Sequence, residues 1–224
     1  MGEAIGQILP LAVGVALSPV PIIGVTLMLA TPRGRSNGLA FIGGWIGGLA
    51  VAGTVFLLLS GGAGAGEGGE PADWVSVVKL VLGALLLFVA GRQWRSRPVA
   101  GAEAPMPKWM QSIDGFRAPK AAGLAVLLAA VNPKNLLLVI AAAAAIAQTG
   151  IDAAQQGVAL AVFVLLATLG PGAPLAIYLL LGDRSRQMLD ELRSWMTQNN
   201  AAIMAVICLV IGAKLIGDGI GGLG

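Results

Sequence analysis

The chain has 224 residues, of which 57% are hydrophobic and only 11% charged, and its mean hydropathy is +0.85. Soluble domains are about a quarter charged, so this chain has too few charged side chains to cover a globule of its size, and we predict an integral membrane protein. Histidine is absent and Cys208 is the single cysteine, which excludes a disulfide framework or a thiolate metal cluster within one chain.

Six apolar stretches follow one another along the chain. They cover residues of about 8–31, 38–60, 75–91, 121–147, 156–181 and 200–220. A helix that crosses a bilayer needs about 20 residues. We therefore predict an all-α integral membrane protein with six transmembrane helices.

The basic residues are concentrated between particular stretches. The segments after the first, third and fifth stretches hold 11 of the 14 Lys and Arg residues, whereas the segments after the second and fourth hold none. The other three, Lys79, Lys134 and Lys214, lie within or at the edge of apolar runs. Because Lys and Arg mark the cytoplasmic side, we expect the three basic segments in the cytoplasm and both termini outside.

Two of the basic segments have amphipathic helical spacing. The apolar positions of the first are Trp109, Met110, Ile113 and Phe116, and those of the second are Met188, Leu189, Leu192, Trp195 and Met196. An amphipathic helix with Trp on its apolar face tends to lie among the lipid head groups. We interpret both as surface anchors, and a regulatory or gating helix is the alternative.

The two halves of the chain carry similar features in the same order. Residues 16–21 read ALSPVP and residues 130–135 read AVNPKN, so each half places a small polar residue before a proline early in an apolar stretch. Three crossings per half reverse the direction of the second half, as in many transporters. We predict two inverted three-helix repeats, residues 1–92 and 121–224, joined by a cytoplasmic linker with an amphipathic helix at 93–120.

The two proline motifs form a candidate substrate site. Proline removes a backbone donor and clashes with the preceding turn, and backbone groups freed in hydrocarbon must find other partners. Two such breaks facing each other near the midplane predict a substrate-binding site. Its residues are Ser18, Pro19, Pro21, Asn132, Pro133, Lys134 and Asn135. The alternative is a pair of structural kinks that bind no ligand.

Lys134 is the most costly of these residues, because a lysine at the centre of a membrane helix costs about 2.5–3.5 kcal/mol on insertion scales. No Asp or Glu occurs deep in any apolar stretch, so the sequence offers no obvious ion-pair partner. We interpret Lys134 as a cationic spot for a carboxylate, phosphate or sulfate group. The alternative is a lysine that reaches the interface or binds carbonyls at the kink.

Two glycine-rich clusters remain. Residues 43–48 read GGWIGG and contain two overlapping GxxxG steps, which permit close helix approach; we favour internal packing over a dimer interface. Gly170, Pro171 and Pro174 lie in the fifth stretch, and we predict that they break this helix near its middle and act as a hinge.

Features of an enzyme are missing from the sequence. It contains no paired-carboxylate site, no nucleophile with a nearby base and no nucleotide loop of the GxxxxGK[ST] type. We expect no catalytic residues, no metal and no cofactor. Nucleic acid is not an expected partner either, because the basic residues lie in short segments between apolar runs.

Six spans in two halves, with Ser18-Pro19-Val20-Pro21 in the first and Asn132-Pro133-Lys134-Asn135 in the fourth, resemble the LysE exporter superfamily. Within it the chain is most similar to the actinobacterial GAP branch, also called Sap or glycolipid-addressing proteins. The resemblance covers almost the whole chain. It implies a multi-pass protein of the bacterial plasma membrane whose relatives are linked to moving glycolipids or peptidoglycolipids to the cell surface.

We therefore predict a membrane transporter that exports an anionic lipid or glycolipid through the midplane site, with membrane lipids as its partners. One alternative is a LysE-type exporter of amino acids or other small solutes, although no deep carboxylate is present to meet an amino group. Another is an accessory subunit of a larger lipid-export machine. A homodimer and a larger lipid-export complex both fit the sequence.

Overall fold

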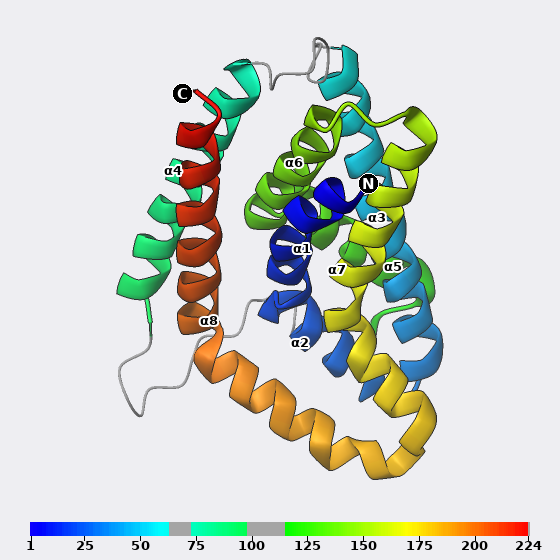
Figure 1. The fold of residues 1–224 in the computed structure, drawn as a ribbon. Coiled ribbons are helices and arrows are strands. Elements are labelled where there is room, and N and C mark those ends of the chain that lie inside the picture. Colours follow the sequence, from blue (N-terminus) through cyan, green and yellow to red (C-terminus); the bar gives the residue numbers. More distant parts are fainter. Residues whose placement is uncertain (63–72, 98–114, 224) are drawn as a thin grey trace.

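The computed structural model describes residues 1–62, 73–97 and 115–223. All regular elements in these ranges are helices (Figure 1). They are α1 (Gly2–Ala16), α2 (Pro19–Leu29), α3 (Gly34–Gly62), α4 (Asp73–Arg95), α5 (Ala118–Val126), a π-helical turn (Leu127–Val131), α6 (Pro133–Gln148), α7 (Ala153–Leu181), a 3₁₀ turn (Gly182–Arg184) and α8 (Ser185–Gly221).

Four helices are long and apolar enough to cross a membrane alone. They are Gly34–Gly61, Trp74–Arg95, Ala153–Leu181 and Ser185–Gly221. Two further candidates are bent pairs: α1 with α2, bent by 49°, and α5 with α6, bent by 61°. The described chain thus has four membrane-spanning candidates, or up to six if each bent pair is one span. The all-α prediction is confirmed for the described residues, and these candidates agree with a multi-pass membrane protein.

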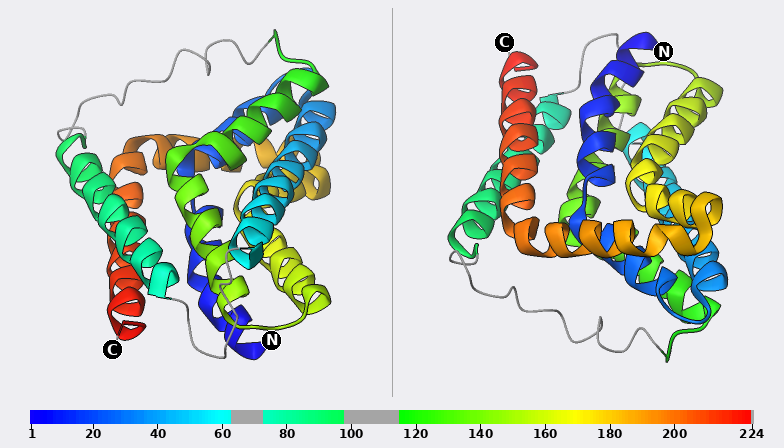
Figure 2. Two further views of the ribbon diagram at one scale, coloured as in Figure 1. Left: turned by 90° about the horizontal axis from the view of Figure 1, so that it is seen from above. Right: turned by 90° about the horizontal axis from the view of Figure 1, so that it is seen from below.

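The helices form two groups that meet at α1 and α6 (Figures 1 and 2). On one side α4 packs along α8; on the other, α3 packs against α5 and α7 against α1. The largest buried side chains include Phe41 and Trp45, whose rings stack with centroids 6.5 Å apart, and Phe163. Helices α1 and α6, one from each broken pair, are therefore central, with continuous helices on both sides.

The connections lie at two opposite ends of the bundle (Figure 1). One end holds both termini and the turn between α6 and α7. The other holds the turn between α2 and α3, the last turn of α4, the start of α5 and the junction of α7 with α8. This second end carries the described parts of the three basic segments.

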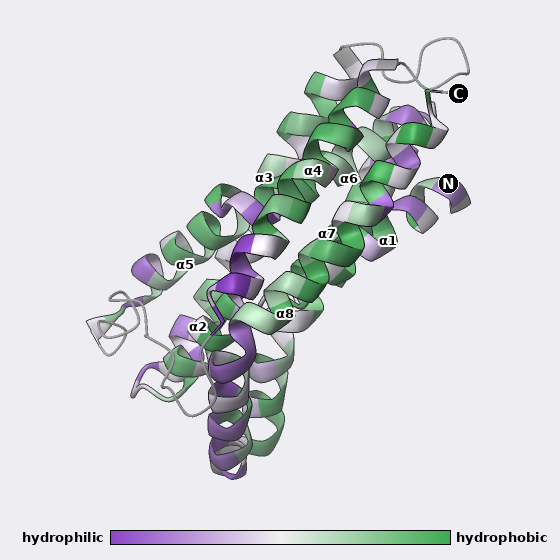
Figure 3. Cartoon of the chain, turned by 90° about the vertical axis from the view of Figure 1, so that its left-hand side faces the viewer, coloured by the Kyte–Doolittle hydropathy of each residue, from purple (hydrophilic) through white to green (hydrophobic). Residues whose placement is uncertain are grey.

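The amphipathic segment before the sixth stretch is part of α8 and not a separate helix. It is helical as predicted and leads into the apolar part within one helix, which changes direction between the two parts (Figure 1). Leu192 and Met196 pack against Ile22 and Ile23 of α2. Figure 3 shows hydrophilic residues along this first part of α8 and hydrophobic residues over most of the bundle.

The other amphipathic prediction falls largely outside the described residues, because it rests on Trp109, Met110 and Ile113. Its last member, Phe116, is half-buried, and its carbonyl accepts a 3.0 Å hydrogen bond from the buried Asn37 side chain. The start of α5 is thereby attached to the start of α3.

The glycines of α3 confirm the prediction of internal packing for one of the two GxxxG steps. A Cβ on Gly44 would overlap the Ala122 backbone of α5, and one on Gly48 would press on Val126. A Cβ on Gly43 or Gly47 would meet nothing within 4 Å. The Gly44–Gly48 step therefore sets the close approach of α3 and α5.

Candidate functional site

The structure brings the two proline breaks together. Ser18, at the start of α2, donates a 2.9 Å hydrogen bond from Oγ to Oδ1 of Asn135, in the first turn of α6. Ser18, Lys134 and Asn135 are all buried, with 3%, 4% and 0% of their surfaces exposed. The predicted meeting of the two motifs is observed for these three side chains.

The break between α1 and α2 frees one carbonyl. Pro19 has no N–H to donate to Val15, and the N–H of Ser18 bonds to the Val15 carbonyl instead, at 3.1 Å. The carbonyl of Gly14 consequently loses the partner that a continuous helix would give it. It instead accepts a 2.8 Å hydrogen bond from Nζ of Lys134, which lies in the other half of the chain.

The break between α5 and α6 follows the same logic. The Asn132 N–H bonds to the Leu127 carbonyl at 3.0 Å, which is the wider spacing of a π-helix and leaves the Leu128 carbonyl free. Nδ2 of Asn135 donates to that carbonyl at 2.9 Å. Asn132 then caps α6 by accepting the Lys134 N–H at 3.1 Å.

The Lys134 ammonium has only neutral partners. Nζ donates to the Gly14 carbonyl and, at 2.5 Å, to Oγ of Ser18. Of the described residues, no Asp or Glu forms an ion pair with it; Arg193–Asp190 and Lys214–Asp218 are ion pairs elsewhere in the structure. The site therefore holds an uncompensated positive charge away from water.

The helix starts add to this positive potential. Both α2 and α6 begin at the site with a proline in the first turn, and a helix N-terminus carries about half a positive charge. A cation at such a position is disfavoured, whereas an anion is favoured. Two helix starts and one buried ammonium together form a site suited to an anionic group.

A sequence profile of the family described as Sap, sulfolipid-1-addressing protein, matches residues 8–221 of the chain. The chain belongs to this family. The predicted membership in the Sap branch is confirmed, and the matched region includes both proline breaks. Neither the comparison with curated proteins nor that with solved structures gives a match.

The remaining site residues predicted for this Sap-family chain shape the breaks. Pro19 and Pro21 are buried in the first turn of α2, Pro133 is exposed at the start of α6, and Asn132 is half-buried. None of the three prolines can donate a backbone hydrogen bond. They define where the helices begin, while Ser18, Lys134 and Asn135 supply the polar contacts.

The predicted break at Gly170, Pro171 and Pro174 is wrong, because α7 is continuous through all three residues. Prolines are tolerated in membrane helices where neighbouring groups satisfy the freed backbone. Gly170 lies against the end of α1, where an added Cβ would overlap the Ala16 carbonyl. The expected hinge thus adjoins the α1–α2 break, and hinge motion stays a prediction.

Two contributors to the site were missed from the sequence. Gly14 supplies the acceptor for Lys134, and its Cα faces Ile211 of α8 so closely that a Cβ would overlap that side chain. Leu128 supplies the carbonyl for Asn135. Both act through backbone carbonyls, which the identity of a side chain does not reveal. For Gly14, the only sign in the sequence was a glycine close to a proline break.

A second buried lysine lies elsewhere. Lys79 of α4, with 5% of its surface exposed, donates a 2.5 Å hydrogen bond to Oε1 of Gln148 at the end of α6. It provides a natural comparison for Lys134, since both ammonium groups are buried but only Lys134 lies at the proline breaks.

Proposed function

We propose that this Sap-family protein transports a lipid or glycolipid with an anionic head group across the bacterial plasma membrane. The observation that carries the proposal is the Lys134 ammonium, buried between two helix starts and bonded only to neutral oxygens. The family description names a sulfolipid, and a sulfated head group is an anion of the kind that this site would bind.

We propose further that each bent pair is a single crossing. The chain then has six crossings in two inverted three-helix repeats with both termini outside, as in transporters of the LysE superfamily. Three observations support this: each half contains one bent pair, α3 and α7 both have 29 residues, and the basic segments share one end of the bundle.

In this mechanism the head group replaces Ser18 Oγ and the Gly14 carbonyl as the partner of Lys134. Their release removes both hydrogen bonds that Lys134 makes to the α1–α2 break, while Ser18 keeps its bond to Asn135. The apolar tails stay in hydrocarbon while the head group crosses. The cargo leaves chemically unchanged, so the protein acts as a transporter and not as an enzyme.

Native mass spectrometry of the detergent-purified protein tests the site. We expect an anionic lipid or glycolipid to remain bound to the wild type and to be lost from Lys134→Met. The matched control is Lys79→Met, which removes another buried ammonium away from the breaks and should retain the lipid. Equal retention by all three proteins would overturn the role of Lys134.

Reconstitution into vesicles separates the transporter from the two alternatives. Translocation of the identified lipid by the purified chain alone, dependent on Lys134, supports the proposal. Translocation only after a partner is added would instead make the chain an accessory subunit of a lipid-export machine. Export of amino acids without lipid movement would favour a small-solute exporter.

A further inference from the structure

An apolar groove lies between α4 and α8, away from the proline breaks. Its volume is about 570 Å³, and its lining includes Trp94 of α4 and Val206 and Leu209 of α8. These three side chains are about half exposed. In a membrane-spanning pair of helices, such a groove is open to the hydrocarbon of the bilayer.

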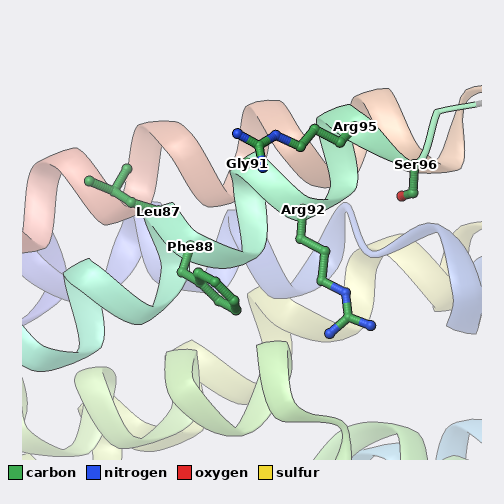
Figure 4. A pocket seen from close by; sticks show the side chains of 6 residues that line it. All are labelled: Leu87, Phe88, Gly91, Arg92, Arg95 and Ser96. Carbon is green, nitrogen blue, oxygen red and sulfur yellow. The ribbon is translucent and has the colours of Figure 1, made fainter.

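A second hollow of about 510 Å³ adjoins the groove on α4 and has a different character. It is lined by Arg92, Arg95 and Ser96 together with Phe88 (Figure 4). Both arginines are exposed, and neither has an ion-pair partner in the part of the chain that the structure describes. A guanidinium binds phosphate, sulfate and carboxylate through two parallel hydrogen bonds.

The two hollows share part of their lining. Gly91 and Leu87 line both of them, and a Cβ built on Gly91 would meet no atom within 4 Å. The missing side chain leaves an opening between the cationic and the apolar parts. Trp94, at the groove, is held by Arg97, whose guanidinium lies 3.9 Å from the ring centroid.

This arrangement matches an amphiphile with a negative head. The arginines lie in the last turns of α4, at the end of the bundle that carries the basic segments, where anionic head groups of the cytoplasmic leaflet are expected. The groove runs from that end along the apolar part of the helix pair. A bound lipid would therefore place its head group at the arginines and its acyl chain in the groove.

We infer that the α4–α8 surface binds a membrane lipid, with its anionic head group on Arg92 and Arg95 and an acyl chain in the groove beside Trp94. This site is separate from Lys134, and its binding does not depend on the proposed transport. Taken with that transport, it would place an anionic lipid on the bundle before the lipid reaches the proline breaks.

Quenching of Trp94 by brominated acyl chains tests the inference on the full chain. The protein is placed in phosphatidylcholine bilayers that contain brominated phosphatidylglycerol or, in parallel, brominated phosphatidylcholine. The difference between wild type and Trp94→Phe isolates the signal of Trp94. We expect brominated phosphatidylglycerol to quench Trp94 at about a tenfold lower mole fraction, because charge-assisted hydrogen bonds favour the anionic lipid.

Two variants should abolish this preference. Arg92→Gln with Arg95→Gln removes the charges, and Gly91→Leu fills the opening from a position where a Cβ meets no atom within 4 Å. The matched controls are Gly47→Leu, at an equally open glycine of α3, and Arg33→Gln with Arg35→Gln, at exposed arginines outside the groove. Controls that behave like the wild type support the site.

Equal quenching by the two lipids, or quenching that the Arg92, Arg95 and Gly91 variants leave unchanged, would overturn the inference. Binding of inorganic phosphate to the arginines without Trp94 quenching would overturn it as well, since it would show a small-anion site. In Lys134→Met, brominated phosphatidylglycerol should quench Trp94 as it does in the wild type. Failure at α4–α8 therefore leaves the transport proposal intact, and failure at Lys134 leaves this site intact.

Discussion

A buried ammonium in an apolar span costs about 2.5–3.5 kcal/mol on insertion scales, and Lys134 has two neutral oxygens to offset that cost. Removal of the ammonium affects the hydrogen bonds of its two partners differently. Ser18 keeps its bond to Asn135 when the ammonium is removed, whereas the Gly14 carbonyl loses its partner from across the breaks. At this position the positive charge is costly for folding, whereas the proposed function requires it to bind an anion.

We expect Lys134→Met to unfold at the same temperature as the wild type or at a higher one, while losing the bound anionic lipid. Replacing the buried charge with an apolar side chain of similar length removes its cost of about 2.5–3.5 kcal/mol, which offsets the cost of about 1–3 kcal/mol for leaving the Gly14 carbonyl without a partner. Thermal unfolding of the two proteins in the same delipidated detergent provides the comparison. A strongly lowered melting temperature would instead make Lys134 a structural residue.

The contact between helices α1 and α7 lies directly beside the α1–α2 break. The carbonyl of Ala16, one turn before α2 begins, lies against the backbone of α7 at Gly170. Two residues later on α7, a Cβ on Gly172 would be 3.8 Å from Thr168, an ordinary contact. These two glycines sit in the same proline-containing segment but have opposite packing requirements.

Gly170→Ala should lower the melting temperature and the yield of folded protein, because its methyl group overlaps backbone that cannot rotate away. Gly172→Ala should match the wild type or exceed it slightly, since alanine is favoured over glycine in a helix by about 0.8–1.0 kcal/mol. Size-exclusion profiles after heating measure both. Equal stability of the two variants would mean that α1 and α7 are not held this closely.

Across the whole molecule, the distribution of basic residues agrees with the arrangement of the helices. The described parts of the three basic segments lie together at one end of the bundle, although they come from three distant parts of the chain (Figure 1). A bilayer normal along the bundle would then place all of them on one side. By the positive-inside rule we expect that side to face the cytoplasm.

Single cysteines in a Cys208→Ser background test this topology. We expect a membrane-impermeant maleimide to label Ala154→Cys in intact bacterial cells, but to label Ser36→Cys and Ser96→Cys only after lysis. All three native positions are exposed, so access to reagent depends on the side of the membrane. Labelling of Ser96→Cys and Ala154→Cys under the same condition would contradict six crossings with both termini outside.

Composition and local chemistry determined the class of protein and the location of its breaks. Few charges over long apolar runs require a membrane, and a proline frees the carbonyl four residues before it, which favours the end of a helix. Ser18-Pro19 and Asn132-Pro133 therefore marked both breaks, and Lys134 marked the charge beside them. The same local rule failed at Pro171, because packing in a membrane can sustain a helix through proline.

Only the tertiary structure decided which groups meet. Ser18 and Asn135 are 117 residues apart, and no local pattern specifies their hydrogen bond. The acceptor at Gly14, the approach of Ala16 to Gly170 and the groove between α4 and α8 likewise come from the packing of distant helices. A sequence states which side chains are costly to bury, whereas the partners that offset that cost depend on how whole helices pack in three dimensions.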